Sequence, residues 1–291
     1  KENFMEESIT MDYAGRPLTV STGRLAKQAD GSVLVQYGDT VVIVTVVADK
    51  KESERDFLPL TVNYQEMSYA AGKFPGGFFK REGKPSDREV LMSRLIDRSI
   101  RPLFPKNFRH ETQVIATVLS ADQENDPALL GMLGASCALT ISQIPFDGPL
   151  AGVKIGRKDG RFVVNPTNED MEESDIDIIV AAKKEAILMV EGATRFIKGD
   201  DLIEAIHFGH QSLLPLIECQ ENLRARYGKD KWLVKEEENI DELKKEMREK
   251  VETELLEAFS IPTKLLRKDK ENEIFERLVS DYADIEEPVL Q

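Results

Sequence analysis

The sequence has little cysteine and no long hydrophobic run, and both shortages exclude classes of protein. Only Cys137 and Cys219 occur in 291 residues, too far apart for a metal or redox motif. Such sparse cysteine is typical of a reducing compartment, so we expect a cytoplasmic location. No apolar run approaches the roughly 20 residues of a membrane span, and the first residues lack the apolar centre of a secretion signal. We therefore expect no membrane partner.

The sequence also lacks the short motifs of several enzyme classes. GxxxxGK[ST], GxGxxG and GxSxG are all absent, which argues against P-loop, dinucleotide and serine-hydrolase chemistry. His207 and His210 form an HxxH pair with no third ligand nearby, so we assign them a structural role. Asp122, Glu124 and Asp126 are candidate metal ligands, but acidic loops before proline are more often turns and helix caps. We therefore predict no metal site.

Charge is abundant and unevenly distributed. The chain carries 39 basic and 53 acidic residues, a net charge of −14, which by itself argues against a nucleic-acid partner. Residues 72–109, however, hold ten basic and four acidic residues, so this segment is +6 and the rest of the chain is −20. An acidic body with one basic segment is the feature that any functional hypothesis must explain.

Hydrophobic periodicity predicts an α/β or α+β domain, followed by a helical domain and the start of a linker. Alternating apolar runs predict strands over 32–48 (a hairpin at Gly38), 60–65, 112–120, 151–156, 161–165, 176–182 and 186–192. Helices are predicted over 87–104 and 127–142, and the acidic run 168–175 as a solvated turn. Three further helices are predicted after Gly199: one from Asp201 toward Gly228, one over 236–260 with an apolar stripe, and a third whose similar stripe includes Leu266, Ile274, Leu278 and Tyr282. We therefore predict a β/α core domain over 1–199, a small all-α domain over 200–285 and a linker beginning at 286–291.

The basic segment begins with a glycine- and proline-rich loop, GKFPGGFFKREGKPSDRE (72–89). It places Phe78 and Phe79 directly before Lys80 and Arg81, with Lys84 close behind. Exposed rings beside cations are typical of single-stranded RNA binding, because bases stack on the rings while cations meet phosphates. The alternative, that both rings are buried and the cations only solvated, is equally compatible with composition.

The helix that follows carries three arginines on one face. Arg94, Arg98 and Arg101 are spaced i, i+4 and i+7, and Asp97 can pair with Arg101. Arginine matches phosphate oxygens through two hydrogen bonds, so such a face favours a polyanion. The alternative is a solvated or salt-bridged face. The loop and the helix together favour a path for a phosphate backbone.

Several longer motifs carry a family resemblance. These are GRLAKQADGSVLVQYGDT, FLPLTVNYQE, YAAGKFPGGFFKREGKPS, SRLIDRSIRPLFP, QVIATVLSADQENDP and IPFDGPLAGVKIGR, in this order from about Gly23 to Ala193. They resemble the N-terminal part of the bacterial polynucleotide phosphorylases. The segment 200–285 resembles the all-helical domain of that family more in position than in residues.

The resemblance implies a phosphate-dependent 3′-to-5′ exoribonuclease that releases nucleoside diphosphates. It implies two RNase PH-like core domains with the helical domain between them, three protomers in a ring around an RNA channel, and Mg²⁺ and inorganic phosphate bound mainly by the second core domain. This chain corresponds to the first core domain and the helical domain, so the resemblance implies no catalytic residue here and predicts that the fragment alone is inactive. The family's channel loop is Phe-Phe-Arg-Arg, so Lys80 departs from it and makes a less directional phosphate contact.

We therefore predict that single-stranded RNA, and not DNA, is the partner, and that the whole protein is a homotrimer. The predicted RNA-binding residues are Phe78, Phe79, Lys80, Arg81, Lys84, Arg94, Arg98 and Arg101. Two alternatives stay open: a non-catalytic RNA-binding ring scaffold, and an acidic protein-interaction domain whose basic segment meets an acidic partner.

Overall fold

The computed structural model describes residues 7–122, 124–234 and 241–282 and divides the chain into two compact units, 1–235 and 236–291. This division differs from the predicted boundary after residue 199. The reason is helix α4 (Gly199–Tyr227), which packs against strands of the first unit and buries Leu213, Ile217 and Leu223 there. The predicted linker, 286–291, lies outside the described residues.

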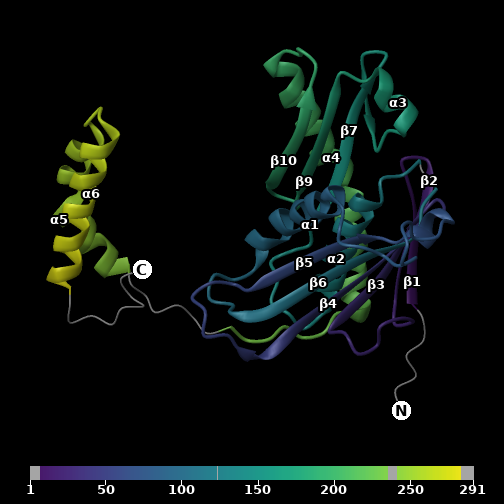
Figure 1. The fold of residues 1–291 in the computed structure, drawn as a ribbon, viewed down its shortest axis with the longest axis horizontal. Coiled ribbons are helices and arrows are strands. Elements are labelled where there is room, and N and C mark those ends of the chain that lie inside the picture. The colour runs from purple at the N-terminus through teal and green to yellow at the C-terminus, as the bar shows by residue number, and fades with distance from the viewer. Residues whose placement is uncertain (1–6, 123, 235–240, 283–291) are drawn as a thin grey trace. The chain divides into compact units, whose positions relative to one another are not determined.

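A six-stranded sheet forms the larger layer of the first unit (Figure 1). Its order is β1-β2-β3-β4-β6-β5, and every neighbouring pair is antiparallel except β5 and β6. The strands are β1 (Glu7–Tyr13), β2 (Arg16–Thr22), β3 (Gly31–Tyr37), β4 (Thr40–Glu52), β5 (Leu60–Glu66) and β6 (His110–Ser120). A parallel pair needs a crossover connection. Residues 67–109 make this crossover, so the topology places the whole basic segment between two neighbouring strands.

A second sheet of four strands has the order β10-β9-β7-β8. Its strands are β7 (Ala151–Lys158), β8 (Arg161–Val164), β9 (Ile176–Ala182) and β10 (Ile187–Thr194). Helix α2 (Pro127–Ile141) contacts β3 and β4 of the first sheet and β7 of the second, and all its residues after Pro127 are buried (Figure 1). Small residues allow this close packing: a Cβ at Gly134 would lie 2.5 Å from Cγ2 of Val44.

The second unit is a helical hairpin. It consists of α5 (Asp241–Phe259) and α6 (Lys264–Asp281), which meet around Val251, Ala258 and Ile274. Both helices were predicted from the apolar stripes of the sequence. Residues 236–240, predicted as the start of the first helix, lie outside the described residues.

Most predicted elements are confirmed, and one hairpin and one short α-helix that the structure contains were not predicted. Gly38 turns the β3–β4 hairpin with a φ of +60°, and α1 (Asp87–Ile100) gives way to a short 3₁₀ helix, η2 (Arg101–Leu103), that contains Pro102. The β1–β2 hairpin was not predicted. The acidic run predicted as a turn contains α3 (Asn168–Glu173), which forms because Thr167 and Asp170 cap each other's backbone.

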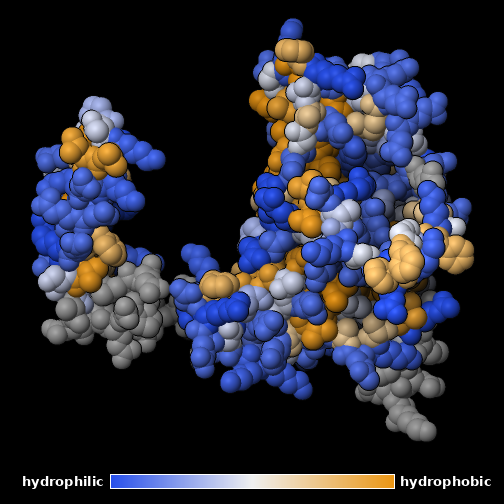
Figure 2. Space-filling model, viewed as in Figure 1, coloured by the Kyte–Doolittle hydropathy of each residue, from blue (hydrophilic) through white to orange (hydrophobic). Residues whose placement is uncertain are grey.

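Polar side chains cover most of the face of the first unit that Figure 2 shows, as expected from a sequence with 32% charged residues. Among the described helices, none combines the length and the apolar character that crossing a membrane would require.

Candidate nucleic-acid interface

The crossover between β5 and β6 presents the aromatic loop, residues 72–85, at the end of β5. The chain leaves β5 through a 3₁₀ turn, η1 (Ser68–Ala71), and Gly72 ends that turn with a φ of +66°. The carboxylate of Glu82 then accepts hydrogen bonds from the backbone N of Ser68 at 2.8 Å and from its Oγ at 3.2 Å. This Glu82–Ser68 clasp joins the two ends of the loop, so the tip between them is held by fixed ends.

The two phenylalanines at the tip point into solvent. Phe78 is 93% exposed and Phe79 82% exposed, and their ring centroids lie 5.5 Å apart in an edge-to-face arrangement. The alternative that both rings are buried is therefore wrong. Positive φ values at Gly77 (+74°) and Lys80 (+50°) bend the backbone on either side of the pair.

The loop cations are also open. Lys80, Arg81 and Lys84 are exposed, and within the described ranges no carboxylate forms an ion pair with any of the three. Their charge is therefore available to a ligand, and exposed rings beside open cations match the predicted pattern for single-stranded RNA.

Helix α1 begins with a reciprocal cap directly after the loop. Ser86 Oγ accepts a hydrogen bond from the Glu89 backbone N at 3.2 Å, and Glu89 accepts one from the Ser86 backbone N at 2.6 Å. Glu89 also accepts a hydrogen bond from the Glu66 backbone N at 2.9 Å. Burial alone would raise the pKa of Glu89, but these backbone hydrogen bonds outweigh it and lower that pKa below its usual value. Glu89 thus joins the start of α1 to the end of β5.

The three predicted arginines, two in α1 and Arg101 at its C-cap, have different surroundings. Arg94 is exposed and has no ion-pair partner among the described residues. Arg98 pairs with Glu191 of β10, a residue remote in sequence. Arg101 donates two hydrogen bonds to Asp97, at 3.0 and 2.7 Å, which confirms the predicted pair. Only Arg94 keeps its guanidinium open.

Arg101 also takes part in covering the edge strand. Its guanidinium donates to the carbonyl oxygens of Leu58 at 3.3 Å and Leu60 at 3.1 Å, while Ser93 Oγ accepts from the Tyr64 backbone N at 2.9 Å. Together with Glu89, these side chains of α1 and its C-cap satisfy backbone groups of β5 and of Leu58 just before it, and β5 has a strand neighbour on one side only. Unpaired edge groups are a liability in a sheet, and α1 removes it here.

A groove runs between α1 and β5. It has a volume of about 380 Å³ and is lined by Arg94, Asp97 and Arg101 from the helix, Pro85 from the loop, and residues of β5. Arg98 does not line it. The structure therefore brings Arg94 and Arg101 to one groove that begins at the loop, and it places Arg98 beside the second sheet.

The acidic loop before α2 has a structural role. Asp122 accepts hydrogen bonds from the backbone N of Glu124 and of Asn125, both at 2.9 Å, Glu124 pairs with Arg16, and Asp126 caps α2 and pairs with Arg88. Within the described ranges, no group of three or more His, Cys, Asp or Glu side chains is arranged to hold a metal ion. The residues present do not fit a Mg²⁺ site.

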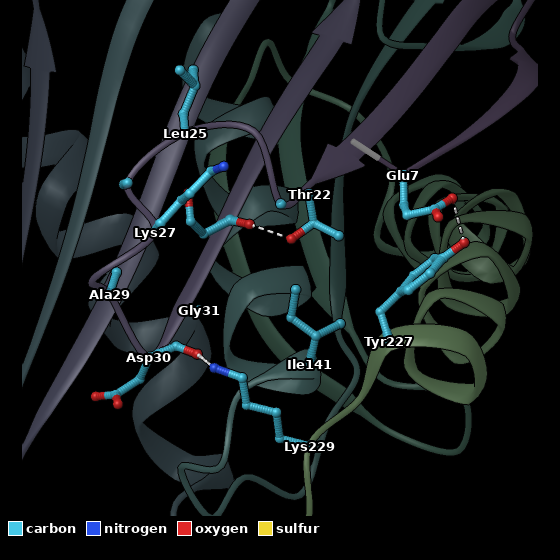
Figure 3. A pocket seen from close by; sticks show the side chains of 13 residues that line it. Glu7, Thr22, Leu25, Lys27, Ala29, Asp30, Gly31, Ile141, Tyr227 and Lys229 are labelled. Carbon is cyan, nitrogen blue, oxygen red and sulfur yellow. Dashed lines mark hydrogen bonds between the residues drawn. The ribbon is translucent and has the colours of Figure 1, made fainter. Parts of the chain in front are cut away.

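A separate cavity lies beside the β2–β3 connection and the end of α4 (Figure 3). Its volume is about 220 Å³. Several of its polar groups are paired: the Tyr227 hydroxyl donates to Glu7 at 2.8 Å, and Lys229 Nζ donates to the Asp30 carbonyl at 2.6 Å. None of the predicted site residues lines this cavity.

Two loop residues were missed by sequence reasoning. Phe74 is 92% exposed, and Glu82 forms the clasp described above. Phe74 was detectable, because it lies in the same glycine-rich segment as Phe78 and Phe79. The role of Glu82 was not, because its partner depends on the turn that η1 makes.

The two sheets and the buried helix between them define an RNase PH-like α+β fold, as predicted. Among solved structures, rice (Oryza sativa) Rrp46 is similar, with a TM-score of 0.55 and 13% identity. The likeness covers 76% of this chain and 94% of that one, and at this identity it supports the fold alone.

The sequence comparisons are more specific. Residues 14–145 match the 3′ exoribonuclease family, domain 1, and residues 148–212 match domain 2 of the same family. The chain belongs to the 3′ exoribonuclease family. Curated relatives named polyribonucleotide nucleotidyltransferase include that of Geotalea uraniireducens, which is 53% identical over 264 residues, covering 90% of this chain and 38% of the relative. The relative from Halalkalibacterium halodurans is 50% identical over 279 residues, covering 96% of this chain and 40% of the relative. The chain thus spans about two-fifths of the length of these relatives.

Proposed function

We propose that this chain forms the RNA-guiding part of a phosphate-dependent 3′-to-5′ exoribonuclease that degrades RNA to nucleoside diphosphates. In this proposal it supplies channel and scaffold, and the main catalytic site lies elsewhere in a longer protein. The observation that carries the proposal is the pair of rings at Phe78 and Phe79, 93% and 82% exposed beside cations that no described carboxylate neutralises. The names of the curated relatives support the same substrate class.

The rings suit bases that are free to leave a duplex. An exposed phenylalanine leaves apolar surface in water, and a stacked base removes that surface at a gain of about 1–3 kcal/mol per base. Every base has a π-face, so stacking holds a strand without selecting its sequence. That tolerance is what a processive nuclease requires.

The open cations suit the phosphates of the same strand. Lys80, Arg81, Lys84 and Arg94 keep their charge free, and Arg94 lines the groove that begins at the loop. We assign Arg98 and Arg101 to positioning α1, because Glu191 and Asp97 already neutralise them. All three arginines were predicted from sequence to bind RNA; in this proposal one of them binds RNA and two stabilise the fold.

Mg²⁺ and inorganic phosphate belong to the whole protein in this proposal. Mg²⁺ would offset charge on the transferred phosphoryl group at a site outside this chain. The side chains described here would hold the strand and set its direction toward that site. A homotrimer of the whole protein, with the loops facing a shared channel, is part of the same proposal.

RNA binding by residues 1–291 tests the proposal. We expect a fluorescein-labelled oligo(A) to bind, and its affinity to fall as salt rises, because the loop cations release counterions from the phosphates. Charge reversal of Lys80 and Arg81 to Glu should abolish most of this binding. The matched control is reversal of Lys244 and Lys245, which are exposed on α5. Equal losses in both double variants would contradict a role for the loop.

A phosphorolysis assay tests the division of labour. Residues 1–291 incubated with poly(A), Mg²⁺ and phosphate should release no ADP above background. Brisk ADP release would overturn the proposal that the main catalytic site lies outside this chain.

A further inference from the structure

Phe74 is as exposed as the two phenylalanines at the loop tip. It is 92% exposed, against 93% for Phe78 and 82% for Phe79. It lies in the same loop, directly after Lys73 and before the Phe78–Phe79 pair. No ring contact joins Phe74 to another aromatic residue of the described chain, so its ring stands apart from the edge-to-face pair.

The backbone holds Phe74 close to a fixed point. The backbone N of Gly72 donates to the Tyr69 carbonyl at 2.9 Å, and that of Lys73 donates to the Ser68 carbonyl at 3.0 Å. Ser68 is also the residue that the Glu82 carboxylate binds. Phe74 therefore follows directly after the clasped base of the loop.

The residue after Phe74 narrows its conformation further. Pro75 restricts the residue before it to extended backbone, because the proline ring would otherwise meet that residue's N–H and Cβ. After Pro75, Gly76 and Gly77 allow the chain to turn before it reaches Phe78 and Phe79, and Gly77 has a positive φ. The loop thus presents one ring just after its base and two at its tip, and local backbone constraints act at both places.

We propose that Phe74 is a third base-stacking residue for single-stranded RNA, contacting a different nucleotide from those that meet Phe78 and Phe79. This inference rests on the proposed function. A ring that is 92% exposed makes almost no contact within the chain, so it contributes little to the fold and leaves its apolar surface open to a ligand. Stacking suits a flexible polyanion here, since Lys73, Lys80 and Lys84 on the same loop attract the strand that supplies the base.

Affinity measurements on three alanine variants test this inference with the 1–291 chain and labelled oligo(A). We expect Phe74→Ala to weaken binding about fivefold or more, the effect of losing one stacked base. Phe57→Ala is the matched control, because Phe57 is 55% exposed but lies outside the loop. It should leave affinity within twofold of the parent.

The Phe78→Ala variant distinguishes a failure of the Phe74 stacking role from a failure of the proposed function. If Phe78→Ala weakens binding and Phe74→Ala does not, the third stacking residue is wrong and the proposed function stands. If neither variant weakens binding, both are wrong.

Two substitutions distinguish stacking from simple apolar contact. Phe74→Trp should restore parental affinity, because indole stacks at least as well as benzene, while Phe74→Leu should behave like alanine. Equal affinity for Leu and Phe would overturn the stacking role. A change in sedimentation mass for Phe74→Ala without RNA would also overturn it, by showing that the ring contacts a second copy of the chain.

Discussion

The aromatic loop and helix α1 follow each other in sequence and each carries several cations, yet they use these cations differently. On the loop, Lys80, Arg81 and Lys84 face solvent with no described carboxylate partner. On the helix, Arg98 and Arg101 are bound to Glu191 and Asp97. A basic segment is therefore not one binding surface: part of its charge faces outward, and part stabilises the fold that presents it.

The two sets of cations differ because the helix lies against backbone groups that need hydrogen-bond partners and the loop tip does not. A helix that covers an edge strand must satisfy that strand's backbone groups, and Arg101 does so for the carbonyls of Leu58 and Leu60. A loop tip has no such groups to satisfy, so its side chains stay free for a ligand. Substitutions of the loop cations and of Arg94 should consequently change RNA affinity, and substitutions of Arg98 or Arg101 should change stability.

The largest expected effect is on the loop. Replacing Phe78 and Phe79 together by alanine should weaken RNA binding by at least about 30-fold, since each stacked base contributes about 1–3 kcal/mol. The unfolding midpoint should not change, because rings that are 93% and 82% exposed stabilise little in the folded chain. Fluorescence anisotropy and urea unfolding measure the two quantities. A loss below threefold would contradict the stacking role.

A smaller effect, on stability, is expected from the helix. Arg101→Ala removes one of the links between the α1 region and β5 and should lower the free energy of unfolding by about 1–2 kcal/mol, after allowance for partial solvent exposure. RNA affinity should stay within twofold. The single tryptophan, Trp232, packs near Phe108 in the first unit and reports its unfolding by fluorescence.

Arg94→Ala is the matched control for that measurement, because Arg94 occupies the same helix without a described ion-pair partner. Its free energy of unfolding should stay within about 0.5 kcal/mol of the parent. If the two variants are equally stable, the distinction between open and structural arginines is wrong.

A further effect, on the pH dependence of stability, concerns a lysine that binds backbone carbonyl groups inside the first unit. Lys231 Nζ donates to the carbonyls of Leu139 at 2.7 Å and Ser142 at 2.8 Å, at the end of α2. Burial, assisted by Arg224, lowers the pKa of Lys231 from 10.5 to about 8. Between pH 8 and 10.5 the unfolded chain therefore binds a proton that the folded chain does not, so this group's contribution to stability rises with pH.

Lys231→Met should remove that pH-dependent gain. The difference in free energy of unfolding between parent and variant should be constant below pH 8 and should shift in favour of the parent from pH 8 to 10.5. Urea unfolding at several pH values measures it. Parallel pH profiles for the two proteins would contradict a lowered pKa at Lys231.

Local sequence signals predicted much of the fold, and long-range contacts explain what they missed. The Gly38 hairpin, the end of α1 before Pro102 and the Asp97–Arg101 pair all depend on residues within four positions of one another. The assignment of α4 to the first unit depends on packing against distant strands, which periodicity does not reveal.

The candidate site shows the same division. The exposed rings and loop cations were predicted because glycine, proline and aromatic residues occur together over a few positions. The Arg98–Glu191 pair joins residues far apart in sequence, and the strand cover by Arg101 needs the β5 edge to be known. Sequence alone therefore predicted where the cations lie and not which of them are free.

The most direct test compares two double variants of the 1–291 chain with both readouts. Lys80→Ala with Arg81→Ala should lose most RNA affinity and reduce its salt dependence while keeping the parental unfolding midpoint. Arg98→Ala with Arg101→Ala should lower the unfolding midpoint and keep RNA affinity within about twofold, measured where both proteins are folded. The reverse pattern, in which the helix pair controls RNA affinity and the loop pair does not, would contradict the account.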